Sequence, residues 1–338
     1  MKDNKVRIAD IADELGLSTA TVSNVIHGKT KKISDRTVEM VQRKLEERQY
    51  IPNMAATLLA QNDSRIIGVM LNNHEKYAGR VLEDPFVASV LNDLANEIER
   101  AGLFMMVKLT GHIKEIVRFA SMWNLDGMVI IGFCEDEYQR LRNQIRIPFV
   151  VYDGFFENRG RICNLTIDDY DGGRQVGEHF RQLGHQNVLC LADNKICMDL
   201  ARYKGFCAGF GEEVPLWQIP MQTQARHAFY REHLEELRQF SAIFAVSDVY
   251  AVDVMQFLLR NGVSVPEEIS VAGFDDSPIC GQIFPSLTSV RQNNSLRART
   301  TLEMLRAMKT DPAYQADRCL PVTLVPREST AKYTKKTV

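Results

Sequence analysis

The apolar positions in the first fifty residues of the chain follow a helical spacing. In the first helical segment they lie three or four positions apart: Ile8, Ile11, Ala12 and Leu15. Gly16 is expected to end this helix, because a left-handed residue is favoured at that place. Ser18 then offers an N-cap for a second helix. The buried side of the second helix is predicted to be Val22, Val25 and Ile26.

The opposite side of the second helix is small, uncharged and rich in hydrogen-bonding groups. It carries Thr19, Ala20, Thr21, Ser23, Asn24 and His27. Such residues suit a short helix that fits inside the major groove of DNA and touches base edges.

A third helix is predicted from the N-cap Ser34 to about Arg48, with Val38, Val41 and Leu45 buried. Four basic residues lie between the second helix and the first turn of the third, where phosphates would be expected: Lys29, Lys31, Lys32 and Arg36. The alternative is a three-helix bundle that binds nothing, with lysines that are merely solvated.

The segment after the third helix predicts a conditional helix. Pro52 cannot continue the preceding helix, and Asn53 is a good N-cap for Met54–Ala60. So short a helix is unstable in isolation, because nucleation is costly. We therefore expect it to fold only against a partner hinge or against DNA.

From Arg65 onward, short apolar runs alternate with amphipathic helical patterns, which predicts an α/β body with parallel sheets. The candidate strands are Ile66–Leu71, Phe104–Leu109, Gly127–Ile131, Phe149–Tyr152, Val188–Leu191, Trp217–Pro220, Ala242–Val246 and Ser270–Gly273. Asp84 and Pro85 are expected to start one helix, and Asp248 is expected to cap another. The strands fall into two sets separated near Arg161–Leu165, which predicts two similar subdomains.

Charge and cysteine content restrict the class of protein. The net charge is −2; residues 1–62 contribute +2, so the remaining 276 residues carry −4. The seven cysteines are scattered without a Cys-x-x-Cys spacing, which favours free thiols in a reducing cytoplasm over disulfides or a zinc site. No signal peptide and no membrane-spanning run is recognised, so an extracytoplasmic solute receptor is disfavoured.

Polar or small residues follow the predicted strands, and open parallel sheets bind ligands beyond these carboxyl ends. The pairs at the strand ends are Asn72-Asn73, Gly132-Phe133, Asp153-Gly154, Ala192-Asp193, Ser247-Asp248 and Asp275-Asp276. Each pair also has a structural explanation, because Asp, Asn and Gly favour turns and caps. For Asp248 and Asp276 we prefer that explanation.

Several longer runs carry a family resemblance. The N-terminal runs are Ile8-Ala9-Asp10-Ile11-Ala12, Gly16-Leu17-Ser18-Thr19-Ala20-Thr21-Val22-Ser23-Asn24-Val25 and Tyr50-Ile51-Pro52-Asn53. The later runs are Arg202-Tyr203-Lys204-Gly205-Phe206, Ser270-Val271-Ala272-Gly273-Phe274-Asp275-Asp276 and Pro326-Arg327-Glu328-Ser329-Thr330. Over almost its full length the chain resembles the lactose-repressor/galactose-repressor (LacI/GalR-type) family of bacterial transcription regulators.

The resemblance implies a division of the chain into a DNA-binding part and a ligand-binding part. It implies a three-helix helix-turn-helix headpiece at 1–50 and a hinge helix at 51–62, followed by two Rossmann-like subdomains of the periplasmic-binding-protein type with a ligand cleft between them. The first subdomain would comprise 63–163 and 293–319, and the second 164–292 and 320–332. A tail at 333–338 lacks the leucine heptads of a tetramer, so a homodimer is expected.

The resemblance also assigns roles in DNA binding. Base reading falls to Thr19, Ala20 and Asn24, and backbone contact to Ser18, Thr21, Ser23, Lys29, Lys32 and Asn53. Leu59 would wedge between base pairs in the minor groove; alternatively, Leu58 and Leu59 only hold two hinges together. Many relatives have arginine where this chain has Asn24. Since asparagine suits adenine and arginine suits guanine, a shifted operator preference is expected.

Five residues match family positions that contact the effector: Phe86, Asp153, Arg202, Ser247 and Asp275. Two carboxylates and a guanidinium can bracket a ring of hydroxyls with charge-assisted hydrogen bonds. Phe86 would either stack on a sugar face or belong to the core. Arg202 has an alternative role as a structural partner of Asp275.

A neutral sugar or sugar-like metabolite is the expected effector class. Purine-binding relatives carry an arginine at the position of Ile196 and a tryptophan at the position of Gly154, and both departures argue against a purine. Asn73–Glu83 looks longer than the usual family loop and would lie at the cleft mouth. Whether the effector releases or tightens the repressor is left open by the sequence.

Other functional classes remain as alternatives. Control by a protein partner or a nucleoside is the second possibility, and a purely DNA-architectural protein is the third. An enzyme is not expected, because no His-Glu-x-x-His, nucleophile elbow or Walker loop occurs, and Gly209-x-Gly211 does not follow a strand. No cofactor and no metal are predicted.

Overall fold

The computed structural model describes residues 6–50, 64–133, 135–156 and 162–334. The chain divides into two compact units, Met1–Ser64 and Arg65–Val338. The expected hinge helix Met54–Ala60 and its N-cap Asn53 lie outside the described residues. No helix in the described ranges is both long and apolar enough to cross a bilayer.

The first unit is a bundle of three helices, α1 (Ile8–Leu15), α2 (Thr19–Ile26) and α3 (Asp35–Glu47). Ile11, Val22 and Val41, one from each helix, are completely buried at its centre. Gly16 ends α1 with a φ of 65°, the left-handed conformation that the sequence predicted. The three predicted helices of the headpiece are therefore confirmed.

Two parallel-dominated sheets form the second unit, which confirms the predicted α/β class. The first sheet contains β1 (Ile66–Leu71), β2 (Phe104–Leu109), β3 (Gly127–Ile131), β4 (Phe149–Tyr152), β5 (Cys163–Ile167) and β11 (Asp317–Leu320). Their order is β11-β5-β4-β3-β1-β2, and each neighbouring pair is parallel.

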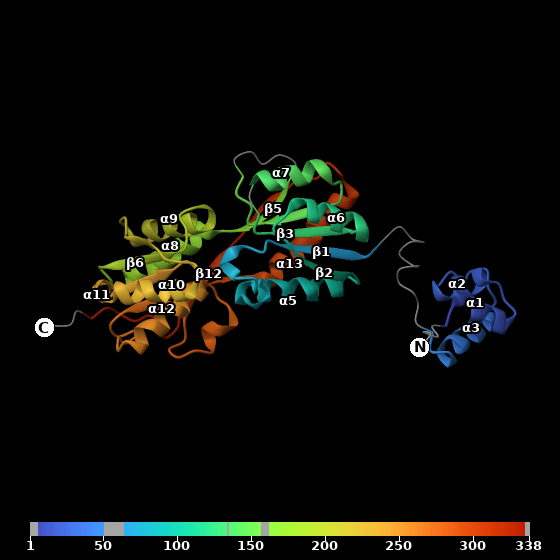
Figure 1. Cartoon of the computed structure of the whole chain (residues 1–338), viewed down its shortest axis with the longest axis horizontal. Helices are drawn as coiled ribbons and strands as arrows, with labels where there is room; N and C mark the ends of the chain where they lie inside the picture. The colour runs from blue at the N-terminus through green and yellow to red at the C-terminus, as the bar shows by residue number, and fades with distance from the viewer. Residues whose placement is uncertain (1–5, 51–63, 134, 157–161, 335–338) are drawn as a thin grey trace. The chain divides into compact units, whose positions relative to one another are not determined.

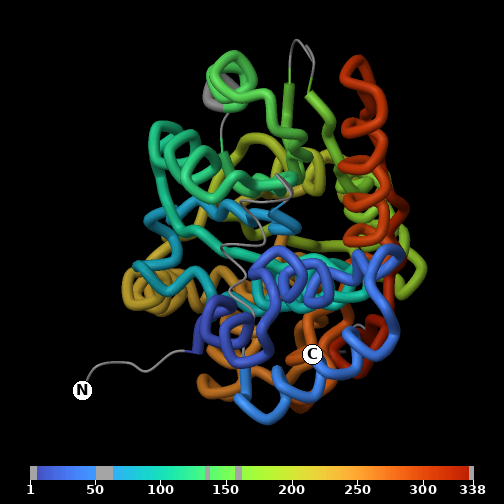
Figure 2. Tube along the Cα trace, turned by 90° about the vertical axis from the view of Figure 1, so that its right-hand side faces the viewer, coloured from blue at the N-terminus to red at the C-terminus, as the bar shows by residue number. Residues whose placement is uncertain are grey.

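Helices cover both faces of the first sheet. They are α5 (Pro85–Arg100), α6 (Ile113–Trp123), α7 (Glu135–Gln144) and α13 (Asn294–Thr310). α6 and α7 lie on one side and α5 and α13 on the other (Figure 1). Although α13 comes from the last part of the chain, it packs among elements from the first half (Figure 2). We call this sheet and its helices the first lobe.

The second sheet contains β6 (Val188–Ala192), β7 (Leu216–Gln218), β8 (Ala242–Ala245), β9 (Ser270–Asp275), β10 (Thr288–Gln292) and β12 (Val322–Val325). Their order is β12-β10-β9-β8-β6-β7, and β12 runs antiparallel to β10. Its helices are α8 (Asp169–Gln182), α9 (Cys197–Phe210), α10 (Thr223–Glu232), α11 (Leu234–Leu237) and α12 (Asp248–Arg260). We call this sheet and its helices the second lobe.

The chain passes between the lobes three times, after β5, after β10 and between β11 and β12. The sequence placed the first passage after Cys163, but the structure places it after Ile167. Cys163, Asn164 and Leu165 pair with β4, so β5 belongs to the first sheet. The strands next to these passages are the last two at one edge of each sheet: β11 and β5 in the first sheet, and β12 and β10 in the second.

Helices α8 and α9 of the second lobe approach each other unusually closely. A Cβ atom built on Gly173 would lie 1.9 Å from the carbonyl oxygen of Arg202, and one built on Gly205 would lie 1.9 Å from that of Tyr170. Gly177 and Gly209 repeat this relation one turn further along. Only glycine permits this backbone contact, since any larger residue would force the helices apart.

Candidate functional site

The exposed face of α2 carries the residues that the sequence assigned to base reading. Thr19, Ala20 and Asn24 are all exposed, whereas Val22 and Val25 on the other side are buried. The arrangement gives α2 a free polar surface of small side chains, and such a surface suits contact with base edges.

The start of α2 is fixed by a local hydrogen bond. The Ser18 hydroxyl accepts from the backbone N–H of Thr21 at 3.1 Å, and the two hydroxyl oxygens lie 2.9 Å apart. Both residues were predicted to contact the DNA backbone, as was Ser23, which is partly exposed. Lys29 and Lys32 are exposed just beyond the helix. Asn53 and Leu59 lie outside the described residues.

In the second unit, the structure brings four of the five expected effector residues to the carboxyl ends of strands. Asp153 follows β4, Ser247 lies between β8 and α12, and Asp275 ends β9. Arg202 lies on α9, and its guanidinium is 3.9 Å from the Asp275 carboxylate. The fifth residue, Phe86, lies at the start of α5, half-buried against the first-lobe core.

Arg202 is a buried guanidinium, 6% exposed, whose main partner the sequence did not reveal. Its Nε donates to Asp169 at 2.7 Å, and its Nη1 donates to the carbonyl of Val246 at 2.6 Å. The guanidinium carbon also lies 3.7 Å from the centre of the Phe274 ring. Arg202 thereby orders the backbone immediately before Ser247 and attracts Asp275.

The pairing of Arg202 with Asp169 depends on the close approach of two helices. Asp169 begins α8 and Arg202 lies in the middle of α9, so the distance between the helices sets the length of the ion pair. The backbone contacts at Gly173 and Gly205 provide that short distance. The glycines therefore position this part of the site.

A second guanidinium connects the two lobes. Arg297 of α13 is 1% exposed and donates to Asp153 at 2.6 Å, in the first lobe. It also contacts the Oε1 atom of Gln292 at 3.4 Å, and the Nε2 atom of Gln292 donates to Asp275 at 2.6 Å in the second lobe. An unbroken set of polar contacts thus joins the carboxyl end of β4 to that of β9.

We name this set the interlobe network. Its members are Asp153, Asp169, Arg202, Asp275, Gln292 and Arg297. Sequence reasoning missed Asp169, Gln292 and Arg297. For Arg297 a signal existed, because it lies at helical spacing from the buried Thr301 and Leu305, where a charge requires a buried partner.

Burial shifts the titration of the carboxyl groups in the interlobe network. It raises the pKa of Asp169 to about 6, although the attraction of Arg202 favours the charged form. Burial also raises the pKa of Asp275 well above its usual value, again against the attraction of Arg202. Carboxyl groups of this kind can accept hydrogen bonds from ligand hydroxyls or, when protonated, donate to them.

A further acidic pair follows β6 in the second lobe. Asp193 accepts from the Tyr250 hydroxyl at 2.7 Å, and the Nδ2 atom of Asn194 donates to both Asp193 and Asp199, at 2.6 and 2.8 Å. Burial, together with the hydrogen bond to Asp193, raises the pKa of Asp199 to about 7 against the attraction of Arg202. Several carboxyl groups therefore gather at the carboxyl edge of the second sheet, and burial favours the neutral form of Asp199 and Asp275.

The N-cap of α12 differs from the sequence-based expectation, which assigned it to Asp248. Ser247, and not Asp248, is the N-cap, because its hydroxyl accepts from the N–H of Tyr250 at 3.5 Å. Asp248 is 1% exposed and accepts from the N–H of Ser277 at 2.7 Å and from the hydroxyl of Ser289 at 2.5 Å. Asp276 accepts from Arg291 and Arg327. Both aspartates therefore have structural partners.

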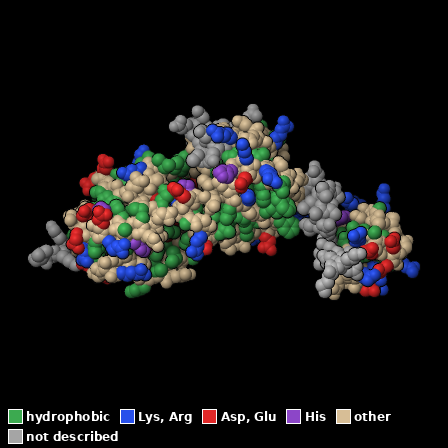
Figure 3. Space-filling model, in the orientation of Figure 1, with side chains coloured by type: hydrophobic (Ala, Val, Ile, Leu, Met, Phe, Trp, Pro, Cys, Tyr) green, Lys and Arg blue, Asp and Glu red, His purple; other side chains and the backbone are tan. Residues whose placement is uncertain are grey.

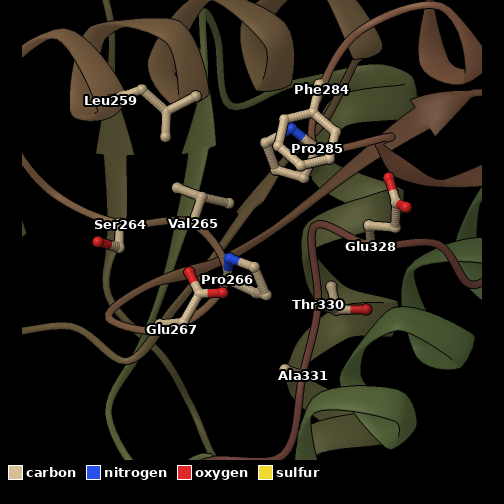
Figure 4. A pocket seen from close by; sticks show the side chains of 10 residues that line it. All are labelled: Leu259, Ser264, Val265, Pro266, Glu267, Phe284, Pro285, Glu328, Thr330 and Ala331. Atoms are coloured by element: carbon tan, nitrogen blue, oxygen red, sulfur yellow. The ribbon is translucent and has the colours of Figure 1, made fainter.

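A pocket of about 630 Å³ opens elsewhere on the second lobe (Figure 4). Val265 and Pro266 line it just before β9, and Phe284, which is 83% exposed, lines it just before β10. The pocket therefore lies at the amino ends of these strands, whereas Asp275 lies at the carboxyl end. It is separate from the interlobe network.

Comparison with known proteins gives two family matches. Residues 7–53 match "Bacterial regulatory proteins, lacI family", and residues 178–330 match "Periplasmic binding protein-like domain". The HTH-type transcriptional regulator CelR of Thermobifida fusca is 26% identical over 310 residues, which is 87% of this chain and 89% of that protein.

Two solved structures share the fold at 22% sequence identity. The lac repressor dimer bound to operator and the anti-inducer ONPF has a TM-score of 0.84, with 97% of this chain and 100% of that chain covered. The transcriptional regulator CelR–cellobiose complex has a TM-score of 0.69, with 96% and 99% covered.

Proposed function

This chain belongs to the lacI family of bacterial regulatory proteins, and we propose that it is a homodimeric repressor controlled by a small metabolite. It is a DNA-binding regulator of transcription and not an enzyme. The observation that carries the proposal is that one chain combines the exposed polar face of α2 with the interlobe network. Its partners would be an operator in double-stranded DNA and a sugar or sugar-like effector, both met in the cytoplasm.

The proposed operator contact uses α2 in the major groove. Thr19, Ala20 and Asn24 would read base edges, while Ser18, Thr21, Ser23, Lys29, Lys32 and Asn53 would contact the backbone. The two-fold symmetry of a dimer predicts a pseudo-palindromic operator. Binding should weaken steeply with added salt, because lysine contacts release counterions from phosphates.

The proposed role of Asn24 gives a direct prediction about sequence preference. An Asn24→Ala variant is expected to lose about 1–3 kcal/mol of discrimination at one half-site position, because asparagine pairs with adenine in a bidentate way. Binding to a library of operator variants measures this loss. A Gln42→Ala variant, changed on the exposed surface of α3, is the matched control and should keep the original preference. An unchanged preference in Asn24→Ala would contradict the assignment.

The proposed dimer is supported by the surface of the first lobe. β2 is an edge strand whose apolar side chains are only partly covered, and Phe104 at its start is 51% exposed. Apolar side chains gather over the region of β1, β2 and α5 (Figure 3). An uncovered apolar edge of this kind favours pairing with a second copy.

The proposed effector site lies between the lobes, at the interlobe network. Asp153, Arg202, Ser247 and Asp275 would contact the ligand, and Phe86 would contribute an apolar surface. The carboxyl groups and guanidinium groups favour a ligand rich in hydroxyls, which can both donate and accept hydrogen bonds. The complex of the related regulator CelR with cellobiose supports a sugar as the leading class.

The proposed mechanism is a shift between two arrangements of the lobes. An effector that contacts both lobes stabilises the closed arrangement by its difference in affinity for the two states. In a dimer this would change the separation of the two hinges and hence their helix content on DNA. Leu59 would act as the minor-groove wedge in the DNA-bound state.

A thermal-shift screen tests the effector proposal. Neutral sugars, sugar phosphates, nucleosides and purine bases are added to the purified full-length chain. A ligand at a hundredfold its dissociation constant is expected to stabilise the folded protein by about 2.7 kcal/mol. We expect neutral sugars to raise the melting temperature. The Asp275→Asn variant should lose this increase. Asp311→Asn, changed at an exposed position, is the matched control and should keep it.

The screen separates the remaining alternatives. A shift only with nucleosides or purine bases would replace the sugar with that class. No shift with any small molecule, combined with operator binding that responds to a carrier protein, would support control by a protein partner. Operator bending that is insensitive to every addition would support an architectural role.

A further inference from the structure

Asp153 stands at a fixed and unusual point of the backbone, directly after β4. Its φ is 54°, in the left-handed region that residues other than glycine adopt at a cost. The N–H of Asp153 donates to the carbonyl of Leu165 in β5 at 3.2 Å. Asn164 holds the following residue, Gly154, because its Nδ2 atom donates to the Gly154 carbonyl at 2.8 Å and its Oδ1 atom accepts from the Gly154 N–H at 3.0 Å. The two neighbouring strands thus determine where the Asp153 side chain begins.

Arg297 fixes one oxygen of the Asp153 carboxylate. Its Nη2 atom donates to Oδ1 of Asp153 at 2.6 Å and to the carbonyl of Leu165 at 3.0 Å. Its guanidinium carbon lies 4.0 Å from the centre of the Tyr152 ring, and the Tyr152 hydroxyl lies 2.6 Å from that of Thr301 on α13. Within the part of the chain that the structure describes, Oδ2 of Asp153 takes part in no hydrogen bond, and the side chain is 11% exposed. One oxygen is therefore held, and the other is left for a ligand.

The second lobe contains a set of the same kind. In each lobe a guanidinium lies against an aromatic ring, and the aromatic residue directly precedes an aspartate with a positive φ at the end of a parallel strand. The sets are Arg297, Tyr152 and Asp153 in the first lobe and Arg202, Phe274 and Asp275 in the second. They differ in one respect, because the shortest carboxylate contact of Arg202 is with Asp169 and not with the aspartate of its own set. Asp153, Arg202 and Asp275 were expected to contact the effector, and Arg297 occupies the corresponding place that was missed.

Stability alone does not account for Arg297. Replacing a buried ion pair by apolar residues of similar volume is often neutral or stabilising, so such a pair is weak evidence for a structural role. Buried donors are also hydrogen-bonded as a rule. The Nε atom of Arg297 is buried, yet none of the described residues accepts a hydrogen bond from it. A guanidinium that is kept beside a passage between the lobes with an unused donor is better explained by its effect on Asp153.

We propose that Arg297 is a positioning residue of the effector site: it holds Oδ1 of Asp153 and so presents Oδ2 as a fixed acceptor to a hydroxyl group of the effector. The first lobe then contributes a preformed acceptor, and less side-chain freedom is lost when the ligand binds. The second lobe meets the ligand with Arg202 and Asp275. That this site receives the effector rests on the proposed function, whereas the hold of Arg297 on Asp153 is tested without a ligand.

Carboxyl labelling of the full-length chain measures this hold. A carbodiimide couples glycine ethyl ester to accessible carboxyl groups, and mass spectrometry gives the rate at each aspartate. Arg297→Met keeps the apolar contact with Tyr152 but removes the donors, so labelling of Asp153 should become roughly three- to tenfold faster, which corresponds to the loss of about one hydrogen bond. Arg297→Lys keeps a charged donor and should restore slow labelling at least in part. Arg299→Met, changed on the exposed side of α13, is the matched control and should leave the rate at Asp153 unchanged.

Asp248 is the internal reference for folding in these measurements. It is 1% exposed and accepts hydrogen bonds from Ser277 and Ser289, so it is labelled only when the second lobe unfolds. Faster labelling of Asp153 with an unchanged rate at Asp248 identifies a local release. If Arg297 only fills the space beside the aromatic ring, the methionine fills it as well, and the rate at Asp153 stays the same. That result would overturn the proposal.

A double-mutant cycle in thermal denaturation tests the same pair independently. Arg297→Met should lower the melting temperature by roughly 6–15 °C, because it leaves a largely buried carboxylate without a cationic partner. Asp153→Asn removes that charge, so the double variant should melt at a higher temperature than Arg297→Met alone. A double variant that melts at the same temperature as Arg297→Met, or below it, would contradict the pairing.

Cellobiose, the sugar in the complex of the related regulator CelR, is the probe for the effector side of the proposal. Arg297→Met is expected to need at least about ten times the concentration that the unchanged protein needs for the same rise in melting temperature, because a charge-assisted hydrogen bond to the ligand is weakened. Arg299→Met should need no more than the unchanged protein. An equal requirement in Arg297→Met would overturn the positioning role. Failure of every sugar to stabilise the unchanged protein would count against the proposed function and would leave the labelling result valid.

Discussion

A Gly205→Ala variant is expected to be destabilised by about 3 kcal/mol and to lose the effector response together with its stability. The added Cβ atom would lie 1.9 Å from the carbonyl oxygen of Tyr170, which belongs to the backbone of α8 and cannot turn aside. Relief requires that α8 and α9 move apart. Because Asp169 lies on α8 and Arg202 on α9, their 2.7 Å contact would lengthen as well.

Thermal denaturation measures the loss of stability in Gly205→Ala. For a body of this size we expect the melting temperature to fall by roughly 6–12 °C. Gly281→Ala is the matched control, because nothing lies within 4 Å of a Cβ atom built there and its φ is not positive. The control should stay within about 0.5 kcal/mol of the unchanged protein. Equal stability of the two variants would contradict the steric argument.

Deletion of residues 1–63 is expected to abolish specific operator binding, with a loss of at least about a thousandfold in affinity. The remaining chain has a more negative net charge than the whole protein, since the N-terminal segment is basic. It therefore lacks both the base-reading face of α2 and the lysines that would contact phosphates. Electrophoretic mobility shift or fluorescence anisotropy with a labelled operator measures the loss.

The deletion has an internal control because the body is a separate compact unit. Circular dichroism and the melting temperature of residues 64–338 should remain close to those of the body in the full chain. A shorter deletion of residues 1–50 should abolish specific binding equally, since it removes α2 but keeps the hinge. Retention of specific binding by either product would refute the assignment of DNA recognition to the headpiece.

The headpiece illustrates how much local patterning determines. Gly16 requires a left-handed backbone, and Ser18 and Ser34 cap the helices that follow them. These signals act within a few residues, so the limits of all three helices could be predicted from the sequence. The same holds for Asp84 and Pro85 at the start of α5. The apolar strands β1 to β4 were likewise evident from apolar runs, although β2, at the sheet edge, is only partly covered.

Four strands were not predicted from the sequence: β5, β10, β11 and β12. β5, β10 and β11 contain polar residues at many positions, because they lie beside the passages between the lobes and carry groups such as Gln292. β12 is a short strand at the sheet edge, antiparallel to β10. A polar strand next to a passage lacks the apolar run or regular alternation on which a sequence-based assignment depends.

Local patterns predicted the class of each described part: three capped helices with a polar outward face, and two βα sets whose strand ends carry Asp153, Ser247 and Asp275. Which charged groups meet depends instead on the tertiary structure. Asp169 and Arg202 come together because glycines let two helices touch, and Arg297 reaches Asp153 and Gln292 because α13 returns to the first lobe. The difference lies in the sequence separation over which each interaction acts. Caps and periodicity act over a few residues, whereas an ion pair across 33 or 144 residues exists only once the packing of helices and the path of the chain between the lobes have fixed its distance.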